Sequence, residues 1–183
     1  MEIYGDYQTS VIKALTEIDK NWRNYKGLII CGSHNPCDIE FLINKIKEAR
    51  ENNIPFYGEC WGHQMAAIEY ARNVMGIEDA TSEEWGQGTF VIKKRKDGLN
   101  VGLKNGESYW NNYYVVNEVF FERDKPKNFF TSQAHPSYQS SIDRPHPLIK
   151  SFLQYAKNQM AVPHSTFAWW RFRRNAKQNL GDD

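Results

Sequence analysis

The sequence has no long hydrophobic run and almost no net charge. No stretch of 18 apolar residues occurs, so no membrane span is expected, and residues 1–8 lack the apolar core of a secretory signal. The 23 Lys and Arg residues against 22 Asp and Glu residues leave a net charge of +1. This balance gives no general argument for a nucleic-acid or membrane partner, and we expect neither.

Cysteine is also scarce, with three residues: Cys31, Cys37 and Cys60. An odd number makes a poor disulfide framework and favours a reducing compartment, so we expect a cytoplasmic protein. Around His34 the pattern Cys-x2-His-x2-Cys lacks the paired cysteines and the fourth ligand of a zinc site, so we expect no metal. The P-loop pattern Gly-x4-Gly-Lys-Ser/Thr is missing as well, and we expect no bound cofactor.

What the chain contains indicates one α/β domain, for which 183 residues are sufficient. Short apolar runs predict buried strands, and apolar residues at helical spacing predict helices between them. This alternation with short connections is typical of a parallel sheet. The expected strands cover residues 2–4, 27–31 and 54–57, and the expected helices begin after Thr9-Ser10, at Asp38 and near Met65.

After Trp85 the pattern changes. Residues 89–92 and 100–103 flank Asp97-Gly98, a strong hairpin signal, and we expect them to form a hairpin. Further strands are expected over 113–121 and 128–131, and a last helix runs from about His146 to Met160.

We place the domain at residues 1–160 and a C-terminal tail at 161–183. Aromatic and basic residues alternate in the tail, over Phe167–Arg174. We expect the tail to pack on the domain as a helix; a surface for a partner or a second copy is the alternative.

The most informative segment is 57–64, which reads Tyr-Gly-Glu-Cys-Trp-Gly-His-Gln. A strand is expected to end here, Cys60 follows in a tight turn between Gly58 and Gly62, and a helix begins. This is the strand–turn–helix context of a nucleophile elbow. The glycines let helix and strand approach closely, and the helix N-terminus stabilises a thiolate. The pattern favours a nucleophilic Cys60 over a small cysteine packed in the core.

A nucleophilic cysteine needs a base, and His135 is the candidate. It lies in the segment 132–137, Ser-Gln-Ala-His-Pro-Ser, directly after an expected strand, and Pro136 stiffens the loop. The alternative is a surface histidine without a catalytic role. His34 and His63 flank the two glycine turns and could lie near the same cleft.

These motifs resemble the class I (triad-type) glutamine amidotransferases, and most closely the glutaminase domain of CTP synthase. The similarity covers residues 26–86, with the cysteine motif, and 129–157, with His135-Pro136. It implies a flavodoxin-like, three-layer α/β sandwich with a mostly parallel central sheet and a β-hairpin excursion.

The resemblance also implies catalytic roles. Cys60 matches the nucleophile and His135 the triad histidine, while Gly32 and the backbone N–H of Trp61 match the oxyanion hole. The implied chemistry is a thioester on Cys60, release of ammonia, and hydrolysis by water that His135 activates.

Substrate positions match only in part. Gln64 and Glu84 match positions that hold glutamine, Glu84 through the amino group. Tyr113 stands where the family has an arginine for the α-carboxylate, and Ser137 stands where the triad sequence His-Pro-Glu has its glutamate. We therefore expect free glutamine to be a poor substrate, and a glutamine-derived amide altered at its carboxylate end to be a better one.

Three other acids are candidates to replace the triad glutamate. Glu59 neighbours the nucleophile, and Glu118 and Asp143 are expected in loops. We expect all three to be solvated surface charges.

Two functions fit these residues. The first is a Cys–His amide hydrolase of the class I type, acting on a small glutamine-like amide; without a P-loop, ammonia transfer would need a synthetase in trans. A homo-oligomer is also possible on this sequence. The second function is a catalytically weakened binding or regulatory protein on the same scaffold.

Overall fold

The structure is a computed structural model of the 183-residue chain, and it describes residues 1–34 and 38–160. Cys37 and the tail at 161–183 lie outside the described residues.

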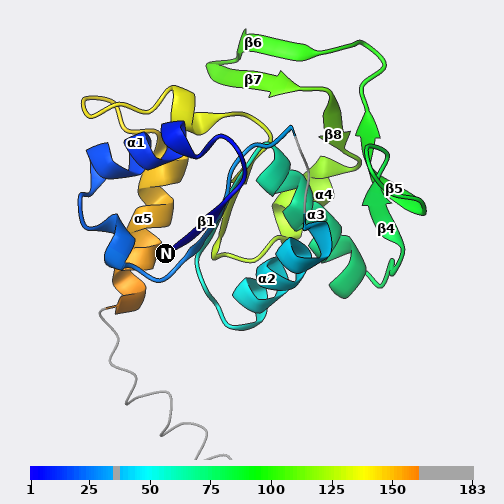
Figure 1. The fold of residues 1–183 in the computed structure, drawn as a ribbon, viewed down its shortest axis with the longest axis horizontal. Coiled ribbons are helices and arrows are strands. Elements are labelled where there is room, and N and C mark those ends of the chain that lie inside the picture. Colours follow the sequence, from blue (N-terminus) through cyan, green and yellow to red (C-terminus); the bar gives the residue numbers. More distant parts are fainter. Residues whose placement is uncertain (35–37, 161–183) are drawn as a thin grey trace, which may run out of the picture.

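Four short parallel strands form the central sheet, in the spatial order β1-β2-β3-β9 (Figure 1). The ladders pair Ile3 with Ile29, Ile29 with Tyr57, and Tyr57 with Phe130, so the strands lie in one continuous register. Each strand predicted for this sheet is confirmed to within two residues. The strands are β1 (Glu2–Tyr4), β2 (Leu28–Ile30), β3 (Phe56–Glu59) and β9 (Phe129–Ser132).

Helices cover both faces of this sheet and make it the middle of three layers, as the sequence predicted (Figure 1). One face carries α1 and α5, whose apolar residues form a core with Ile29 and Tyr57. The other face carries α2 and α3, which form a second core with Ile30 and Phe56. The helices are α1 (Gln8–Ile18), α2 (Ile39–Glu51), α3 (Trp61–Asn73) and α5 (Pro147–Met160).

The start of α1 differs from the prediction. The helix begins at Gln8, so Thr9 and Ser10 lie inside its first turn instead of capping it. A tertiary contact explains this, because Tyr7 N donates to Gly32 O at 3.1 Å and fixes the chain where the helix starts. After α1, Trp22 lies in a separate 3-10 turn, η1 (Trp22–Asn24).

The hairpin predicted around Asp97-Gly98 is wrong in its partners. Strand β5 pairs with β4 and β8, and β6 pairs with β7. The turn between β6 and β7 is Asn105-Gly106, with φ of 52° and 82°, which suits the two-residue turn of a hairpin. The expected β-hairpin excursion is present, but it turns at Asn105-Gly106 and not at Asp97-Gly98. The strands are β4 (Ala80–Ser82), β5 (Thr89–Lys94), β6 (Asn100–Lys104), β7 (Glu107–Asn111) and β8 (Tyr113–Val115).

The prediction of one long strand over residues 113–121 is also wrong. Strand β8 ends at Val115, and helix α4 (Glu118–Asp124) follows. Asn117 has a left-handed backbone, with φ of 58°, which ends the extended chain before the helix. The short helix buries Phe121 against Tyr70 of α3.

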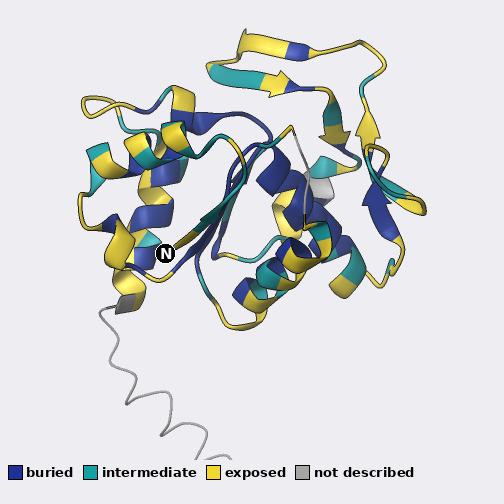
Figure 2. Cartoon of the chain, viewed as in Figure 1, coloured by how far each residue is buried: buried dark blue, intermediate teal, exposed yellow. Residues whose placement is uncertain are grey.

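Helix α3 is largely buried, and the β6–β7 hairpin is largely exposed (Figure 2). Within the described ranges no helix combines the length and the apolar character needed to cross a bilayer.

Candidate active site

Cys60 occupies a strained turn between β3 and α3. Its φ of 56° and ψ of −101° are rare for a residue with a side chain. Two backbone bonds hold it there: Cys60 N donates to Ser132 O at 2.8 Å, and Gln64 N donates to Cys60 O at 3.2 Å. The turn places the thiol at the N-terminus of α3, at the carboxyl ends of the parallel strands, where α/β folds bind ligands.

The two glycines beside Cys60 allow the close packing that the sequence predicted. A Cβ on Gly62 would overlap the carbonyl oxygen of Ile30 and lie 2.8 Å from its carbonyl carbon. A Cβ on Gly58 would lie 2.9 Å from the carbonyl group of Gly62. Helix α3 therefore contacts β2 and β3 backbone to backbone, which fixes the position of the turn.

His135 comes to the same place from the end of β9. Its backbone N donates to Ser108 O at 2.7 Å, so the β6–β7 hairpin holds the loop. The imidazole stacks on Tyr138, with 4.9 Å between ring centroids, and only 2% of the residue is exposed. Among the described residues, Nε2 of His135 has no hydrogen-bond partner of good geometry, and the side chain of Cys60 interacts with the ring.

Glu59 contradicts the expectation of a solvated surface charge. It is completely buried, and its Oε1 lies 3.2 Å from Nδ1 of His135. Ser137 Oγ donates to Oε1 at 2.8 Å, and Ser137 N donates to Oε2 at 3.1 Å. Tyr57 OH completes the set at 2.7 Å from Oε2. Glu59, the last residue of β3, points inward because successive side chains of a strand alternate between its two faces. The sequence alone did not indicate that His135 lies on that side.

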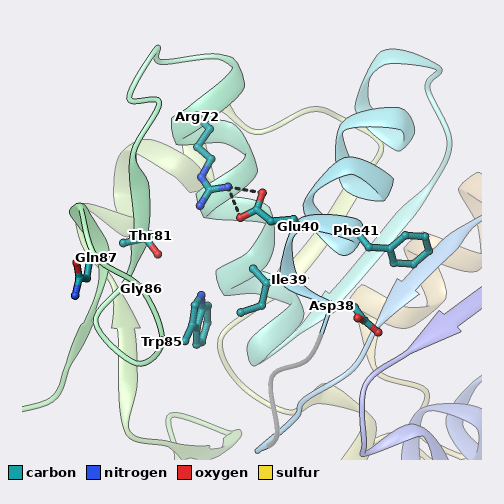
Figure 3. A pocket seen from close by; sticks show the side chains of 9 residues that line it. All are labelled: Asp38, Ile39, Glu40, Phe41, Arg72, Thr81, Trp85, Gly86 and Gln87. Atoms are coloured by element: carbon teal, nitrogen blue, oxygen red, sulfur yellow. Dashed lines mark hydrogen bonds and ion pairs between the residues drawn. The ribbon is translucent and has the colours of Figure 1, made fainter.

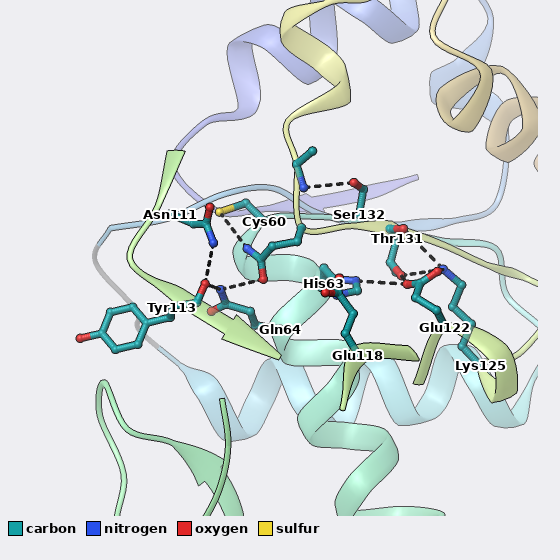
Figure 4. A network of polar contacts seen from close by, with 12 residues as sticks. Cys60, His63, Gln64, Asn111, Tyr113, Glu118, Glu122, Lys125, Thr131 and Ser132 are labelled. Atoms are coloured by element: carbon teal, nitrogen blue, oxygen red, sulfur yellow. Dashed lines mark hydrogen bonds and ion pairs between the residues drawn. The ribbon is translucent and has the colours of Figure 1, made fainter. Parts of the chain in front are cut away.

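The other two candidate acids lie elsewhere. Glu118 sits 3.2 Å from Nε2 of His63, and Asp143 is exposed on a surface loop, as expected of it. His63 is itself fully buried between α3 and α4, so it does not share the site with Cys60 (Figure 4). His34 does lie at the site, because its ring contacts Tyr7 and Trp110 edge-on.

The charges around His135 favour its protonated form. Burial alone lowers the pKa of an imidazole, but the hydrogen bond with Glu59 and the polar side chain and negative charge of Cys60 outweigh it and raise the pKa of His135 to about 10. Burial of the Cys31 thiol, together with the charge of Glu59, raises the pKa of this thiol well above its usual value.

The free energy of unfolding is therefore expected to fall as the pH rises from about 6.5 to about 10. The folded protein keeps a proton on His135 that the unfolded chain releases near its ordinary pKa of 6.5, so the contribution is full below 6.5 and lost through about 10. We expect a loss of roughly 1–3 kcal/mol by denaturant titration. The loss should be smaller in His135→Gln; an equal pH dependence in both proteins would contradict the assignment.

A chain of buried amides leads away from the sulfur (Figure 4). Gln133 Nε2 lies 3.8 Å from Cys60 Sγ, and Gln133 Oε1 accepts from Gln64 Nε2 at 3.2 Å. The carbonyl of Tyr113 then accepts from Gln64 at 3.4 Å and from Asn111 Nδ2 at 2.6 Å. Sequence reasoning missed Gln133, although its place two residues before His135 was a usable signal.

The predicted oxyanion residues also lie at the sulfur. A Cβ on Gly32 would lie 3.1 Å from Cε1 of His135 and 3.7 Å from Cβ of Cys60, so Gly32 leaves open the space between them. Trp61 is the first residue of α3, where backbone N–H groups have no partner within the helix. The carbonyl of Trp110 lies 3.8 Å from Sγ and covers the site from the hairpin.

The predicted substrate residues lie further out. Gln64 is buried and bonded within the amide chain, whereas Glu84 is exposed overall, although partial burial of its carboxyl raises its pKa. Burial and the charges of Glu84 and Glu83 raise the pKa of Tyr113, which places its hydroxyl near these acids. In Figure 4 the Tyr113 ring extends away from Cys60.

A separate surface pocket lies beyond Glu84, between the start of α2 and the loop before β5 (Figure 3). The Arg72 guanidinium pairs with both oxygens of Glu40 at 2.9 Å across its edge, and Trp85 forms one wall. Neither Cys60 nor His135 lines it. In the described ranges there is also no cluster of three or more His, Cys, Asp or Glu residues that could hold a metal ion.

The fold and the site define an α/β protein with a cysteine in a strained strand–turn–helix elbow, beside a buried histidine. The family described as "Glutamine amidotransferase class-I" matches residues 4–155. The chain belongs to this family.

Similar proteins include CTP synthases. The CTP synthase of Methanoculleus marisnigri is 30% identical, with 83% of this chain and 36% of that protein aligned. That of Lactobacillus acidophilus is 32% identical, with 69% and 33% aligned. This chain therefore spans about a third of the length of the curated relatives that it matches. The solved glutaminase domain of Trypanosoma brucei CTPS, with bound acivicin, shares the fold: its TM-score is 0.64 at 21% identity, over 86% of this chain and 93% of that one.

Proposed function

We propose that this chain hydrolyses the side-chain amide of glutamine or of a glutamine-derived compound through a thioester on Cys60. The observation that carries the proposal is the position of Cys60, in a strained turn at a helix N-terminus beside the buried His135. Such turns cost energy and persist where they present a reactive group.

The steps follow from this arrangement. The Cys60 thiolate attacks the amide carbon, and the resulting oxyanion lies where the N–H groups of Gly32 and Trp61 can donate to it. His135 gives its proton to the departing nitrogen, so ammonia leaves and a thioester remains. Water then attacks the thioester carbon and His135 takes the water's proton. The products are a carboxylic acid and the free Cys60 thiolate, beside His135 with its proton restored.

The ammonia released in this way suits an acceptor enzyme. The similar proteins are CTP synthases, so we propose a partner synthetase that accepts the ammonia, in the cytoplasm. The β6–β7 hairpin supports a partner or a second copy of the chain, because Val101, Leu103 and Trp110 are exposed apolar residues on an element that covers Cys60.

Free L-glutamine is expected to be hydrolysed at less than about 1 s⁻¹, below ordinary enzymes. Tyr113 offers no cation for the α-carboxylate, and a charge-assisted bidentate contact accounts for roughly 10- to 150-fold in binding. The measurement is ammonia release from L-glutamine and from derivatives blocked at the α-carboxylate, with Cys60→Ala as the blank.

The variant Tyr113→Arg should raise kcat/KM for L-glutamine by about 10-fold or more. Tyr114→Arg is the matched control, because the next residue of β8 points to the opposite face of the strand. An equal gain in both variants, or fast turnover of L-glutamine by the unmodified chain, would show that the carboxylate end of the substrate is not altered.

The second function, a binding or regulatory protein with weakened catalysis, is favoured by Ser137 and Tyr113. The buried contact between Glu59 and His135 speaks against it, because a chain without catalysis has no need for a carboxylate at the imidazole. Ammonia release separates the two functions.

A further inference from the structure

We propose that Glu59 is the positioning carboxylate of this site: from the residue before the nucleophile, it orients the His135 imidazole towards the Cys60 thiol. The family pattern supplies such a carboxylate two residues after the histidine, where this chain has Ser137. The proposal rests on the proposed function for its catalytic consequence only, since orientation and protonation of the imidazole can be measured without substrate.

The geometry of the Glu59–His135 pair supports this role. Oε1 of Glu59 lies 3.2 Å from Nδ1 of His135, and both side chains are buried. A carboxylate only accepts hydrogen bonds, so Nδ1 carries the shared proton and Nε2 on the far side of the ring is left for the thiol. In a Ser-His-Asp triad the aspartate performs this function.

Hydrogen-bond donors hold both carboxylate oxygens of Glu59 in place. Tyr57 OH, Ser137 N and Ser137 Oγ all donate to its two oxygens, at 2.7 to 3.1 Å. A buried carboxylate is costly unless it is paired and hydrogen-bonded. The four residues of β3 are all buried and Glu59 is its only charged one, so packing of the strand gives no reason for a charge at this point.

Positions 59 and 137 are also coupled. Ser137 occupies the position of the family glutamate, and its hydroxyl donates to Oε1 of Glu59 at 2.8 Å and lies 3.0 Å from Ser10 Oγ. Carboxylates at both positions would place two negative charges within hydrogen-bond distance of each other. The chain therefore carries one carboxylate and one donor, with the two roles exchanged between the positions.

A purely structural role, in which Glu59 only ties the loop after β9 to β3, makes different predictions. It would affect folding, but not the titration of the imidazole. The charged groups that face the His135 imidazole are Glu59 and Cys60. The rings of Tyr7 and Tyr138 contact the imidazole, and Cys31 and Tyr57 lie beside Glu59.

The test is the titration of His135 by NMR in the full chain, with the resonance assigned by His135→Gln. In Glu59→Gln, which keeps the size of the side chain and removes its charge, the titration midpoint should fall by at least about one pH unit. In the double variant Glu59→Gln with Ser137→Glu, the midpoint should return close to that of the unmodified chain. The matched control is Glu118→Gln, which removes a carboxylate from a second buried histidine, His63, and should leave His135 unchanged.

The rate of Cys60 alkylation by iodoacetamide against pH gives a second readout, and its profile should shift with the His135 midpoint in the same variants. Hydrolysis of the best amide should fall by about 10- to 1,000-fold in Glu59→Gln, chiefly in kcat, and recover in the double variant.

An unchanged His135 midpoint in folded Glu59→Gln would overturn the proposal, as would a double variant that folds without restoring the midpoint. If Glu59→Gln alone fails to fold, the double variant decides by the same criterion. Lack of hydrolysis by the unmodified chain would count against the proposed function and not against this assignment, because neither titration nor alkylation needs a substrate.

Discussion

Replacing Cys60 with alanine is expected to lower amide hydrolysis by about 10⁴-fold or more, close to the uncatalysed background. The thioester route depends on the sulfur, and the oxyanion N–H groups have little to stabilise without it. The same substitution should remove the fast phase of alkylation at neutral pH. Cys31 cannot replace it, because that thiol is fully buried and its pKa is raised.

The matched control is Cys31→Ala, which removes a buried sulfur one strand away. It should keep hydrolysis and the fast alkylation within about 3-fold, although the small cavity costs about 1 kcal/mol of stability. Substantial hydrolysis by Cys60→Ala, or alkylation of Cys31 before Cys60, would show that the turn does not present the nucleophile.

Gly62→Ala is expected to destabilise the fold by more than about 4 kcal/mol, or to prevent folding. The added methyl group would overlap the backbone carbonyl of Ile30, which cannot rotate away as a side chain could. Helix α3 would have to move off β2, and this movement would open the contact that fixes Cys60. Denaturant unfolding of the purified variant measures the loss.

Gly76→Ala serves as the comparison, because Gly76 has a φ of 74° and no heavy atom within 4 Å of an added Cβ. Only backbone strain is expected there, at about 1 kcal/mol. Losses of similar size at the two positions would mean that α3 does not pack on β2 as closely as the structure shows.

The sequence predicted the parts of the fold that depend on local pattern. Buried strands and amphipathic helices came from periodicity. The strand pairing after Trp85 could not be predicted in this way. Asp97-Gly98 and Asn105-Gly106 are both good turn signals, and only the register of β6 on β7 selects one of them. The helix over Glu118–Asp124 depended on a left-handed Asn117, which side-chain patterns do not reveal.

For the site, the sequence by itself determined the Gly-x-Cys-x-Gly turn and the candidate partner His135, because an elbow is a local arrangement of strand, turn and helix. Only the tertiary structure decided the surroundings of the imidazole. Glu59 and His135 are 76 residues apart, and they meet because β3 and β9 pair with Glu59 opposite Ser132. A carboxylate read as a surface charge becomes a buried partner through that register, because parallel pairing brings the ends of distant strands to one edge of the sheet.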